Sequence, residues 1–563
     1  MTGTDCVDAP WVDGKTIGQV LHETAGRVGG RPAMIFHDRG FTASYAEFDR
    51  LVNDAARGFM AMGINKGDHV AIWATNWPEW VITQFATARI GAVMVNINPA
   101  YRAGELEYVL KQSDAKLLVT IDRFKTSDYV GMIRELCPEV ATARIGKLAS
   151  TKFPRLRSMV FLGDGPPPGM LRWRDLLDRG RSIGEEALQI REQSLDAQDP
   201  INMQYTSGTT GFPKGAMLTH RNLLLNAFYV GDCQQLTVDD RVCIPVPFYH
   251  CFGCVLGTIA TAVYGAAMVI PSDYFDPGKT LDAVEKHRAT SLFGVPTMFI
   301  AQLEHASYPS RNLSSLRTGV MAGSPCPIEL MKRVTGEMGA RELTIAYGLT
   351  EFSPVITQTR TDDPIERRVE TVGRPLPGVE VKIVDPASGS TLPAGQQGEL
   401  CARGHGVMLG YYKLPEATAK AIDPDGWLHT GDLSVQTPDG YYRITGRIKD
   451  MIIRGGENVY PREVEEFLYS YPKIEEVQVI GVPDVNYGEE IGAWIKLKAG
   501  QEATAEEIRE FCRARIAHFK VPRHIKFVTT FPMTVTGKIQ KFKMRELMIE
   551  ELGLHTAAQI KTA

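Results

Sequence analysis

Short apolar stretches alternate with helical patterns over the first two thirds of the chain. Residues 69–75 and 92–96 form apolar runs typical of buried strands, and the segment between them predicts a helix that begins near Pro78. Pro78 suits a first helical turn because its missing N–H would have no partner there. Residues 289–295, followed by Pro296, repeat the arrangement. Strands alternating with helices predict a doubly wound α/β layer fold.

The pattern changes after about residue 370. Residues 380–384 and 398–403 alternate as strands of a hairpin or small barrel do. An amphipathic helix is predicted over 460–468, and a capping box at 504–507 precedes another apolar helical face. The sequence therefore predicts a large α/β part with a small barrel-like subdomain, followed by a small α+β domain.

Composition and charge exclude several classes of protein. The 563 residues are 44% apolar and 23% charged, as in ordinary globular proteins, and a net charge of −4 gives no basic footprint for nucleic acid. The first ten residues lack the apolar region of a secretory signal and the arginines of a transit peptide. The longest apolar run, 255–270, is interrupted by polar residues, which favours a core helix leading into a core strand over a membrane span of about 20 residues. We expect a cytoplasmic protein with no transmembrane segment and no nucleic acid partner.

The nine cysteines are scattered along the chain, which indicates reduced, mostly buried thiols. Cys251 and Cys254 have a spacing found in metal sites. No second Cys/His pair stands at the distance that a zinc site needs, so we expect no metal at this pair.

A segment rich in glycine and hydroxyl residues, 205–215, carries the strongest chemical signal. Its glycines allow a tight turn that aims backbone N–H groups at an anion, and Lys214 adds a positive charge. A surface turn is the alternative, but a strand-like run over 201–205 and the lysine favour phosphate binding. Because Gly215 follows the lysine, the segment is not a Walker A loop. The predicted phosphate-binding residues are Thr206, Ser207, Gly208, Thr209, Thr210, Gly211 and Lys214.

Five further short motifs follow this segment along the chain. They are 247–253 (PFYHCFG), 347–351 (YGLTE), 427–433 (WLHTGDL), 446–450 (GRIKD) and 536–539 (TGKI). Together, and in this order, the six resemble the motifs of the adenylate-forming superfamily, which includes acyl- and aryl-CoA synthetases, luciferases and the adenylation domains of peptide synthetases. The resemblance covers about residues 15–550 and is closest to medium-chain fatty acyl-CoA synthetases.

The resemblance implies an ATP-dependent acyl-CoA ligase with magnesium as metal and coenzyme A as acceptor. It implies an adenylation domain over residues 1–446, a hinge over 447–450 that contains Lys449, and a mobile C-terminal domain over 451–563. Rotation of the small domain would separate the two half-reactions. Activation brings a carboxylate anion to the α-phosphate of ATP, so fixed cations and magnesium should carry most of the catalysis.

The resemblance also implies individual roles. Tyr347 stacks on adenine, Asp432 accepts hydrogen bonds from the ribose, and Glu351 with Thr206 ligates Mg²⁺, which prefers oxygen donors. For Tyr347 a core aromatic and for Asp432 a turn cap are the alternatives. The nucleotide- and CoA-binding residues implied beyond the phosphate loop are Gly323, Ser324, Pro325, Tyr347, Gly348, Asp432, Arg447, Gly455 and Gly456.

Lys538 is implied as the principal catalytic residue, with Thr350 and His250 completing the catalytic set. A long ammonium side chain suits a bridge between a carboxylate and the α-phosphate. A solvated turn is the alternative for Lys538, a plain hairpin for Gly455–Gly456, and a satisfied half-buried imidazole for His250.

The substrate is predicted to be a hydrophobic acid. Peptide-synthetase domains place an aspartate in the segment that matches 247–253, whereas this chain has Phe248, Tyr249 and His250. A medium-chain fatty acid is therefore expected, with a short branched or aromatic acid as an alternative. A ligase that loads a carrier protein, a luciferase-like oxygenase and a nucleotide-dependent switch are the competing functions. A homodimer is possible from the sequence but has no motif of its own.

Overall fold

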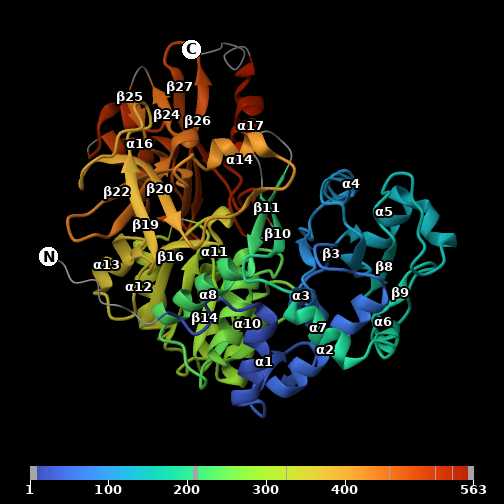
Figure 1. Cartoon of the computed structure of the whole chain (residues 1–563). Helices are drawn as coiled ribbons and strands as arrows, with labels where there is room; N and C mark the ends of the chain where they lie inside the picture. The colour runs from blue at the N-terminus through green and yellow to red at the C-terminus, as the bar shows by residue number, and fades with distance from the viewer. Residues whose placement is uncertain are drawn as a thin grey trace. The chain divides into compact units, whose positions relative to one another are not determined.

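The computed structural model describes residues 9–206, 213–324, 326–454, 457–513, 515–534 and 537–555. The chain divides into two compact units. The first contains Met1–Glu380 and Ala402–Leu428, and the second contains Val381–Cys401 and His429–Ala563. Figure 1 shows the elements of both units coloured along the chain.

Two large sheets organise the first unit. The nine-stranded sheet has the order β18 (Arg374–Pro375), β17 (Val355–Gln358), β16 (Glu342–Gly348), β15 (Thr318–Ala322), β14 (Ser291–Gly294), β12 (Arg241–Cys243), β13 (Ala267–Ile270), β1 (Pro32–Phe36) and β2 (Phe41–Ser44). The eight-stranded sheet has the order β21 (Gly410–Tyr411), β11 (Lys214–Thr219), β10 (Pro200–Thr206), β4 (Val93–Asn96), β3 (His69–Trp73), β5 (Leu117–Thr120), β8 (Ser158–Phe161) and β9 (Leu171–Arg172). A short hairpin joins β6 (Arg123–Phe124) to β7 (Ser127–Asp128).

Helices connect and cover these strands. They are α1 (Ile17–Val28), α2 (Tyr45–Ala61), α3 (Pro78–Ile90), α4 (Ala103–Gln112), α5 (Tyr129–Leu136), α6 (Trp173–Gly180), α7 (Glu185–Gln193), α8 (His220–Cys233), α9 (Ala260–Tyr264), α10 (Pro277–His287), α11 (Pro296–Leu303), α12 (Ile328–Glu337), α13 (Ile365–Glu370) and α14 (Pro415–Ala421). Among the helices in the described part of the chain, none combines the length and the hydrophobicity that crossing a bilayer requires.

The predicted α/β units are confirmed. The apolar runs 69–75 and 92–96 form the parallel neighbours β3 and β4, and α3 between them starts with Pro78 in its first turn. Nearly all side chains of α3 are buried, as expected of a helix covered on every side. The run 289–295 forms β14, and α11 follows it from Pro296.

The apolar run 255–270 also folds as predicted, as a core helix that leads into a core strand. The helix begins as a π-helix over Phe252–Ile259, continues as α9 and is followed by β13. Gly265 ends it with a φ of 68°, the left-handed conformation that favours glycine after a helix. The wide π-helical turn was not predictable, because all eight residues of Phe252–Ile259 are buried and their side chains show no periodicity that would distinguish an α-helix from a π-helix.

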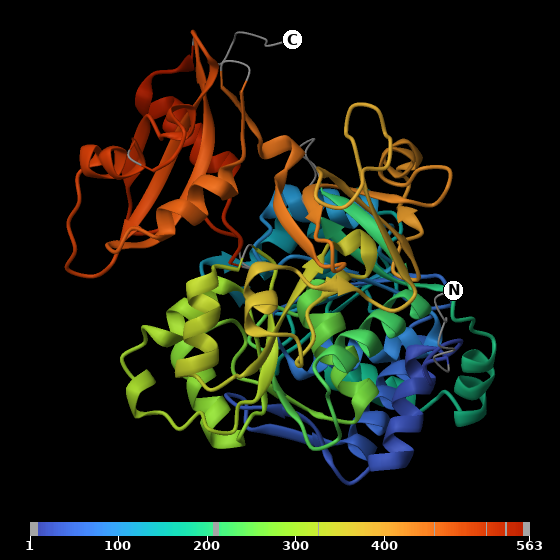
Figure 2. The same ribbon diagram turned by 90° about the vertical axis from the view of Figure 1, so that its left-hand side faces the viewer.

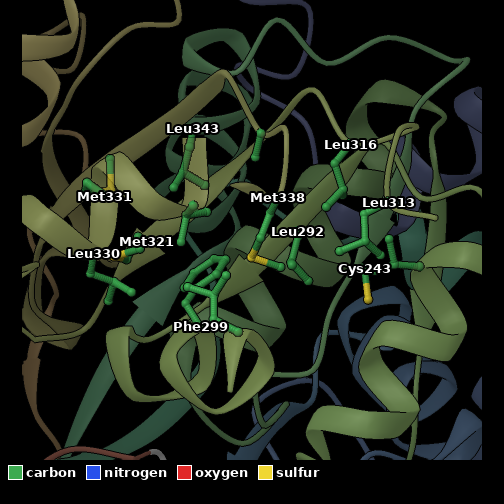
Figure 3. Packing of buried hydrophobic residues seen from close by; sticks show 14 of the residues in the cluster. Cys243, Leu292, Phe299, Leu313, Leu316, Met321, Leu330, Met331, Met338 and Leu343 are labelled. Atoms are coloured by element: carbon green, nitrogen blue, oxygen red, sulfur yellow. The ribbon is translucent and has the colours of Figure 1, made fainter. Parts of the chain in front are cut away.

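A core of apolar side chains fills the space between the nine-stranded sheet and the helices that cover one of its faces. Leu292 of β14, Met321 of β15 and Leu343 of β16 meet Phe299 of α11 and Met338 after α12 (Figure 3). This core fixes the adjacent strands β14, β15 and β16, whose carboxyl ends carry part of the candidate site.

The second unit contains most of a four-stranded sheet and all of a five-stranded one. The first has the order β19 (Val379–Val384), β20 (Gln397–Gly404), β22 (Leu428–Gln436) and β23 (Tyr442–Arg447). The second has the order β25 (Glu457–Val459), β24 (Ile452–Arg454), β27 (Gly488–Leu497) and β26 (Ile474–Asp484), with β28 (His524–Phe527) also paired to β27. Its helices are α15 (Pro461–Tyr469), α16 (Ala505–Arg513) and α17 (Lys541–Leu552).

Strand β26 shows why this α+β unit holds together. Val477 and Val479 pack into one apolar cluster with α15 and α16, whereas Ile480 and Val482 pack into another with α17. Alternate residues of a strand face opposite sides of its sheet, so the sheet is covered by helices on both faces. Figure 2 shows these helices on either side of the orange and red strands. The predicted α+β character of the C-terminal part is thereby confirmed, while the hinge over 447–450 stays a prediction.

Candidate active site

The predicted phosphate-binding segment joins two antiparallel strands. β10 ends at Thr206, β11 begins at Lys214, and the register places these two residues opposite each other. The strand predicted over 201–205 is confirmed as part of β10. The predicted loop residues Ser207, Gly208, Thr209, Thr210 and Gly211 lie outside the described residues. Thr206 and Lys214 therefore mark the two ends of the connection.

Glu351 lies beside this connection. It belongs to the 3₁₀ turn Thr350–Phe352, which follows β16, and only 9% of its surface is exposed. Its Oε1 accepts hydrogen bonds from the Thr206 hydroxyl at 3.3 Å and from the Tyr411 hydroxyl at 2.7 Å. The structure thus brings together Glu351 and Thr206, the two predicted metal ligands. A carboxylate and a hydroxyl are oxygen donors of the kind that Mg²⁺ prefers.

Tyr411 was missed in the sequence. It lies on the short strand β21, which pairs with β11 so that Tyr411 is opposite Ala216. The Lys214 Nζ lies 4.4 Å from the centre of the Tyr411 ring, a cation–π distance. Burial and the neighbouring Glu351 carboxylate raise the pKa of the Tyr411 phenol, so it remains a hydrogen-bond donor. The tyrosine orients both a predicted metal ligand and the predicted phosphate-loop lysine.

The predicted adenine-binding residues lie at the carboxyl ends of two neighbouring strands of the nine-stranded sheet. β15 and β16 are parallel, with Ala322 opposite Ala346. Gly323 and Ser324 follow β15, and Tyr347 is the last residue but one of β16, so they lie at the carboxyl ends of neighbouring strands, where α/β sheets bind ligands. Gly323 has a φ of 87°, which favours glycine. Pro325 lies outside the described residues.

Gly348 has a structural reason to be glycine. A Cβ at this position would lie 1.9 Å from the backbone oxygen of Pro354. The close approach comes from the turn that leads from β16 through Thr350 to β17. Any side chain here would push apart the two segments that hold Glu351 and Tyr347.

His250 immediately precedes the π-helix Phe252–Ile259. Its Nδ1 accepts a hydrogen bond from the Phe252 N–H at 3.2 Å, so in the neutral ring the proton lies on Nε2. His250 is half-buried, whereas Phe248 is fully buried and packs against Phe36 and Trp80. The segment 247–253 is therefore anchored by its buried aromatic rings, and His250, in the middle of the segment, is partly exposed.

In the second unit, Asp432 and Arg447 form an ion pair. β22 and β23 are antiparallel with these residues opposite each other, and Arg447 Nε lies 3.0 Å from Asp432 Oδ1. Asp432 is nearly buried, and its N–H donates to the Thr430 hydroxyl at 3.1 Å. Asp432, predicted at the ribose, and Arg447, predicted at the ribose or the phosphates, are thus brought together by one strand pair.

Lys538 lies in a tight turn of the second unit. Its N–H donates to the Thr534 hydroxyl at 3.0 Å, and its carbonyl accepts from the Thr534 N–H at 2.7 Å. Gly537 has a φ of 77°, so the turn requires glycine immediately before the lysine. The preceding motif residue, Thr536, lies outside the described residues, as do the predicted Gly455 and Gly456 between β24 and β25.

A basic cavity of about 530 Å³ lies in the second unit next to β24. Its lining residues are Arg454, Tyr487, Glu490, Arg509, Arg513, His518, Val521, Pro522, Arg523 and His524. Arg454 forms two hydrogen bonds with the fully buried Glu490, at 2.8 and 2.7 Å. The lining contains four arginines, two histidines and one carboxylate. Glu506, outside the lining, pairs with Arg509 and Arg513, so the cavity keeps a small excess of positive charge. The sequence signal for this cavity is the concentration of basic residues between 509 and 526.

Three features define an adenylate-forming enzyme. They are the two large, mainly parallel sheets, the Glu351–Thr206 pair of oxygen ligands beside a connection rich in glycine, and the α+β unit. The model of the AMP-binding enzyme family matches residues 21–412, and that of the AMP-binding enzyme C-terminal domain matches residues 463–538. The chain belongs to the AMP-binding enzyme family.

Relatives and solved structures agree with this assignment. YngI of Bacillus subtilis (strain 168), named as a candidate acyl-CoA synthetase, is 53% identical over 96% of this chain and 98% of its own length. The human medium-chain acyl-CoA ligase ACSF2, mitochondrial, is 43% identical over 96% of this chain and 89% of its own length. The anthranilate CoA ligase AuaEII, solved in complex with anthranoyl-AMP, has a TM-score of 0.83 at 27% identity and covers 96% of this chain and 98% of its own.

Proposed function

We propose that this protein is an ATP-dependent acyl-CoA ligase for medium-chain fatty acids. It converts the acid and ATP to acyl-AMP and pyrophosphate, and then transfers the acyl group to coenzyme A with release of AMP. The observation that carries the proposal is the contact of Glu351 with Thr206, at one end of the connection rich in glycine and hydroxyl residues.

The first half-reaction needs charge neutralisation. Glu351 and Thr206 would hold Mg²⁺, which lowers the charge of the triphosphate when it is bound. Lys214 and the loop amides would hold the phosphates, and Lys538 would bridge the attacking carboxylate and the α-phosphate. Tyr347, Asp432 and Arg447 would orient the adenosine, while Thr350 and His250 complete the catalytic set.

The second half-reaction needs a thiol acceptor that carries phosphates. The cavity around Arg454, Arg513 and Arg523 has the charge to hold the phosphates of coenzyme A. Gly455 and Gly456, next in the chain after Arg454, would let the pantetheine arm pass close to the backbone. Rotation of the C-terminal domain about residues 447–450 would exchange Lys538 for this thiol channel.

The acid is proposed from the pocket segment and the relatives. The segment 247–253 has no aspartate to pair with an amino group, and its neighbours in the chain are apolar. The ACSF2 relatives are named as medium-chain ligases. The anthranilate ligase shows that an aromatic acid is used by a protein with this fold, so an aromatic acid is the second candidate.

Cytoplasmic location and homodimer formation stay predictions. The ACSF2 relatives are named as mitochondrial, so location differs among proteins of this kind.

The test is a panel of acids from acetate to palmitate, with benzoate and anthranilate, in the presence of ATP, Mg²⁺ and CoA. We expect AMP and pyrophosphate as products and the highest kcat/KM for acids of intermediate chain length. One methylene should change kcat/KM by no more than about 10- to 200-fold, because it is worth about 1–3 kcal/mol. ADP and phosphate as products, or a rate independent of the acid, would contradict the proposal. Faster transfer to a loaded carrier protein than to CoA would identify the carrier-loading alternative.

A further inference from the structure

Three side chains of different chemistry converge between strands β20 and β22 of the second unit. Glu399 and Cys401 stand two residues apart on β20, so they face the same side of the sheet. His429 comes from the neighbouring strand β22, and its Nδ1 lies 2.9 Å from Glu399 Oε2 and 3.4 Å from Cys401 Sγ. One ligand atom of each residue lies within 4.8 Å of the other two.

These separations are close to the edges of a tetrahedral metal site. With Zn–S near 2.3 Å and Zn–N and Zn–O near 2.0 Å, tetrahedral angles give S–N edges of about 3.5 Å and N–O edges of about 3.3 Å. The observed values of 3.4 and 2.9 Å require shifts of only a few tenths of an ångström. Two of the three edges thus nearly fit a tetrahedral ion, and the third, between Cys401 and Glu399, lies within 4.8 Å.

Backbone contacts fix the carboxylate for this purpose. Glu399 Oε1 accepts a hydrogen bond from the Gly431 N–H at 2.9 Å, which leaves Oε2 directed at His429. Such bonds to the second oxygen orient a carboxylate as a monodentate ligand. Thr430, which follows His429 in the chain, donates to the Leu400 carbonyl at 2.7 Å. The segment 429–431 is therefore hydrogen-bonded to β20 at both Glu399 and Leu400.

The exposure of the three residues differs in a way that suits an accessible site. Cys401 is fully buried, whereas about a third of the His429 side chain is exposed. Three protein ligands with one open side is the arrangement in which a water takes the fourth position of a zinc ion. A metal ion would reach the three ligands from the side on which His429 is exposed to solvent.

We propose that Glu399, Cys401 and His429 form a binding site for Zn²⁺ that is distinct from the magnesium site at Glu351 and Thr206. A thiolate and an imidazole select a borderline-soft cation, whereas magnesium prefers oxygen donors alone. Binding displaces the thiol proton of Cys401, while the proton of the neutral His429 ring stays on Nε2, so the site takes up metal with release of a proton and binds more tightly as the pH rises.

The experiment is a Co²⁺ titration of the full-length, metal-free protein without added tags, ATP, acid or CoA. We expect one equivalent to give a thiolate-to-cobalt charge-transfer band in the near ultraviolet and the visible bands of tetrahedral Co²⁺. Added Zn²⁺ should displace the cobalt, and excess Mg²⁺ should not. Because no substrate is present, the outcome is independent of the proposed ligase function.

Variants assign the ligands. Cys401→Ala should remove the charge-transfer band, and Cys401→Ala and His429→Ala should each weaken Zn²⁺ binding by at least about 100-fold, since loss of even an outer partner costs 10–100-fold. Cys243→Ala, which removes a buried thiol from the core of the first unit, is the matched control and should bind as the parent does.

Two results would overturn the proposal. One is the absence of a charge-transfer band in the parent protein. The other is unchanged Zn²⁺ affinity in His429→Ala. This result decides the matter even if Cys401→Ala does not fold, because about a third of the His429 side chain is exposed and its removal disturbs packing less than removal of the fully buried Cys401 thiol.

Discussion

The hydroxyl of Tyr411 donates a hydrogen bond of 2.7 Å to Oε1 of Glu351, a residue 60 positions earlier in the chain. Thr206 donates to the same oxygen, so a strand end, a 3₁₀ turn and the short strand β21 meet at one carboxylate. This oxygen is the predicted magnesium ligand, and its position depends on Tyr411 as much as on the motif that contains it.

Tyr411→Phe should lower kcat/KM for MgATP about 10-fold, because a hydrogen bond to a charged group is worth about 1.5–3 kcal/mol. The decrease in kcat/KM should be smaller at high Mg²⁺ concentration, because the variant keeps the Glu351 carboxylate as a metal ligand but orients it less well. Initial rates measured against Mg²⁺ concentration test this. Tyr412→Phe, which removes a hydroxyl bonded to Asp114, is the matched control, and an equal response of the two variants would argue against the role of Tyr411.

Arg513→Ala should raise the KM for CoA about 10-fold and leave acid-dependent ATP–pyrophosphate exchange unchanged, because the lost contact is a charge-assisted bond to a CoA phosphate. The same comparison with dephospho-CoA identifies the phosphate. If the penalty vanishes with dephospho-CoA, the 3′-phosphate is the partner of Arg513. Arg333→Ala, at an exposed ion pair on α12, serves as control. A KM for CoA that does not respond to Arg513→Ala would remove the basic cavity from the acceptor site.

Gly348→Ala should destabilise the first unit by about 1–3 kcal/mol, the usual cost of overpacking, because its Cβ would meet the Pro354 carbonyl. Gly336→Ala is the matched control: it lies within α12 with open space around a Cβ, so it should stabilise by up to about 1 kcal/mol. Urea unfolding of both variants measures the difference. Equal unfolding free energies of the two variants would show that the turn after β16 accommodates the added methyl group without loss of stability.

His220 makes stability depend on pH. Burial lowers the pKa of its ring to about 4, from an ordinary value near 6.5 in the unfolded chain. The unfolded state therefore binds the extra proton, so the contribution of the neutral ring is complete above about pH 6.5 and is lost as the pH falls toward 4, by roughly 3 kcal/mol in total.

His220→Asn should accordingly flatten the fall of the unfolding free energy between pH 6.5 and 4, although it lowers stability at neutral pH by disturbing the bond from the Ile17 N–H to Nδ1. Denaturant unfolding at several pH values measures the slopes of the parent and the variant. A variant slope equal to that of the parent would contradict the assignment.

The sequence predicted the elements whose hydrophobic pattern is unambiguous. β3, β4 and β14 are continuous apolar runs, and the proline that opens α3 marks its start. The capping box at 504–507 forms as predicted, with reciprocal bonds between Thr504 and Glu507. Such signals depend only on neighbouring residues, so they can be recognised in the sequence without knowledge of the tertiary structure.

The parts that were missed depend on register between distant segments. Tyr411 reaches Glu351 only because β21 pairs with β11, and the cluster of Glu399, Cys401 and His429 forms only because β20 and β22 are neighbours. Their spacing in the chain resembles no metal motif. The basic cavity likewise collects Arg454 together with residues more than 50 positions later.

The most direct test of the account separates the two half-reactions in Lys538→Ala. Adenylate formation, followed by acid-dependent ATP–pyrophosphate exchange, should fall about 100- to 1,000-fold, the scale of losing one electrostatic contact to a transition state. Transfer of the acyl group from supplied acyl-AMP to CoA should stay near the parent rate, and Lys543→Ala, at an exposed lysine of α17, should change neither. Pyrophosphate exchange at the parent rate in Lys538→Ala would contradict the central claim that this ammonium group neutralises the charge of the adenylation step.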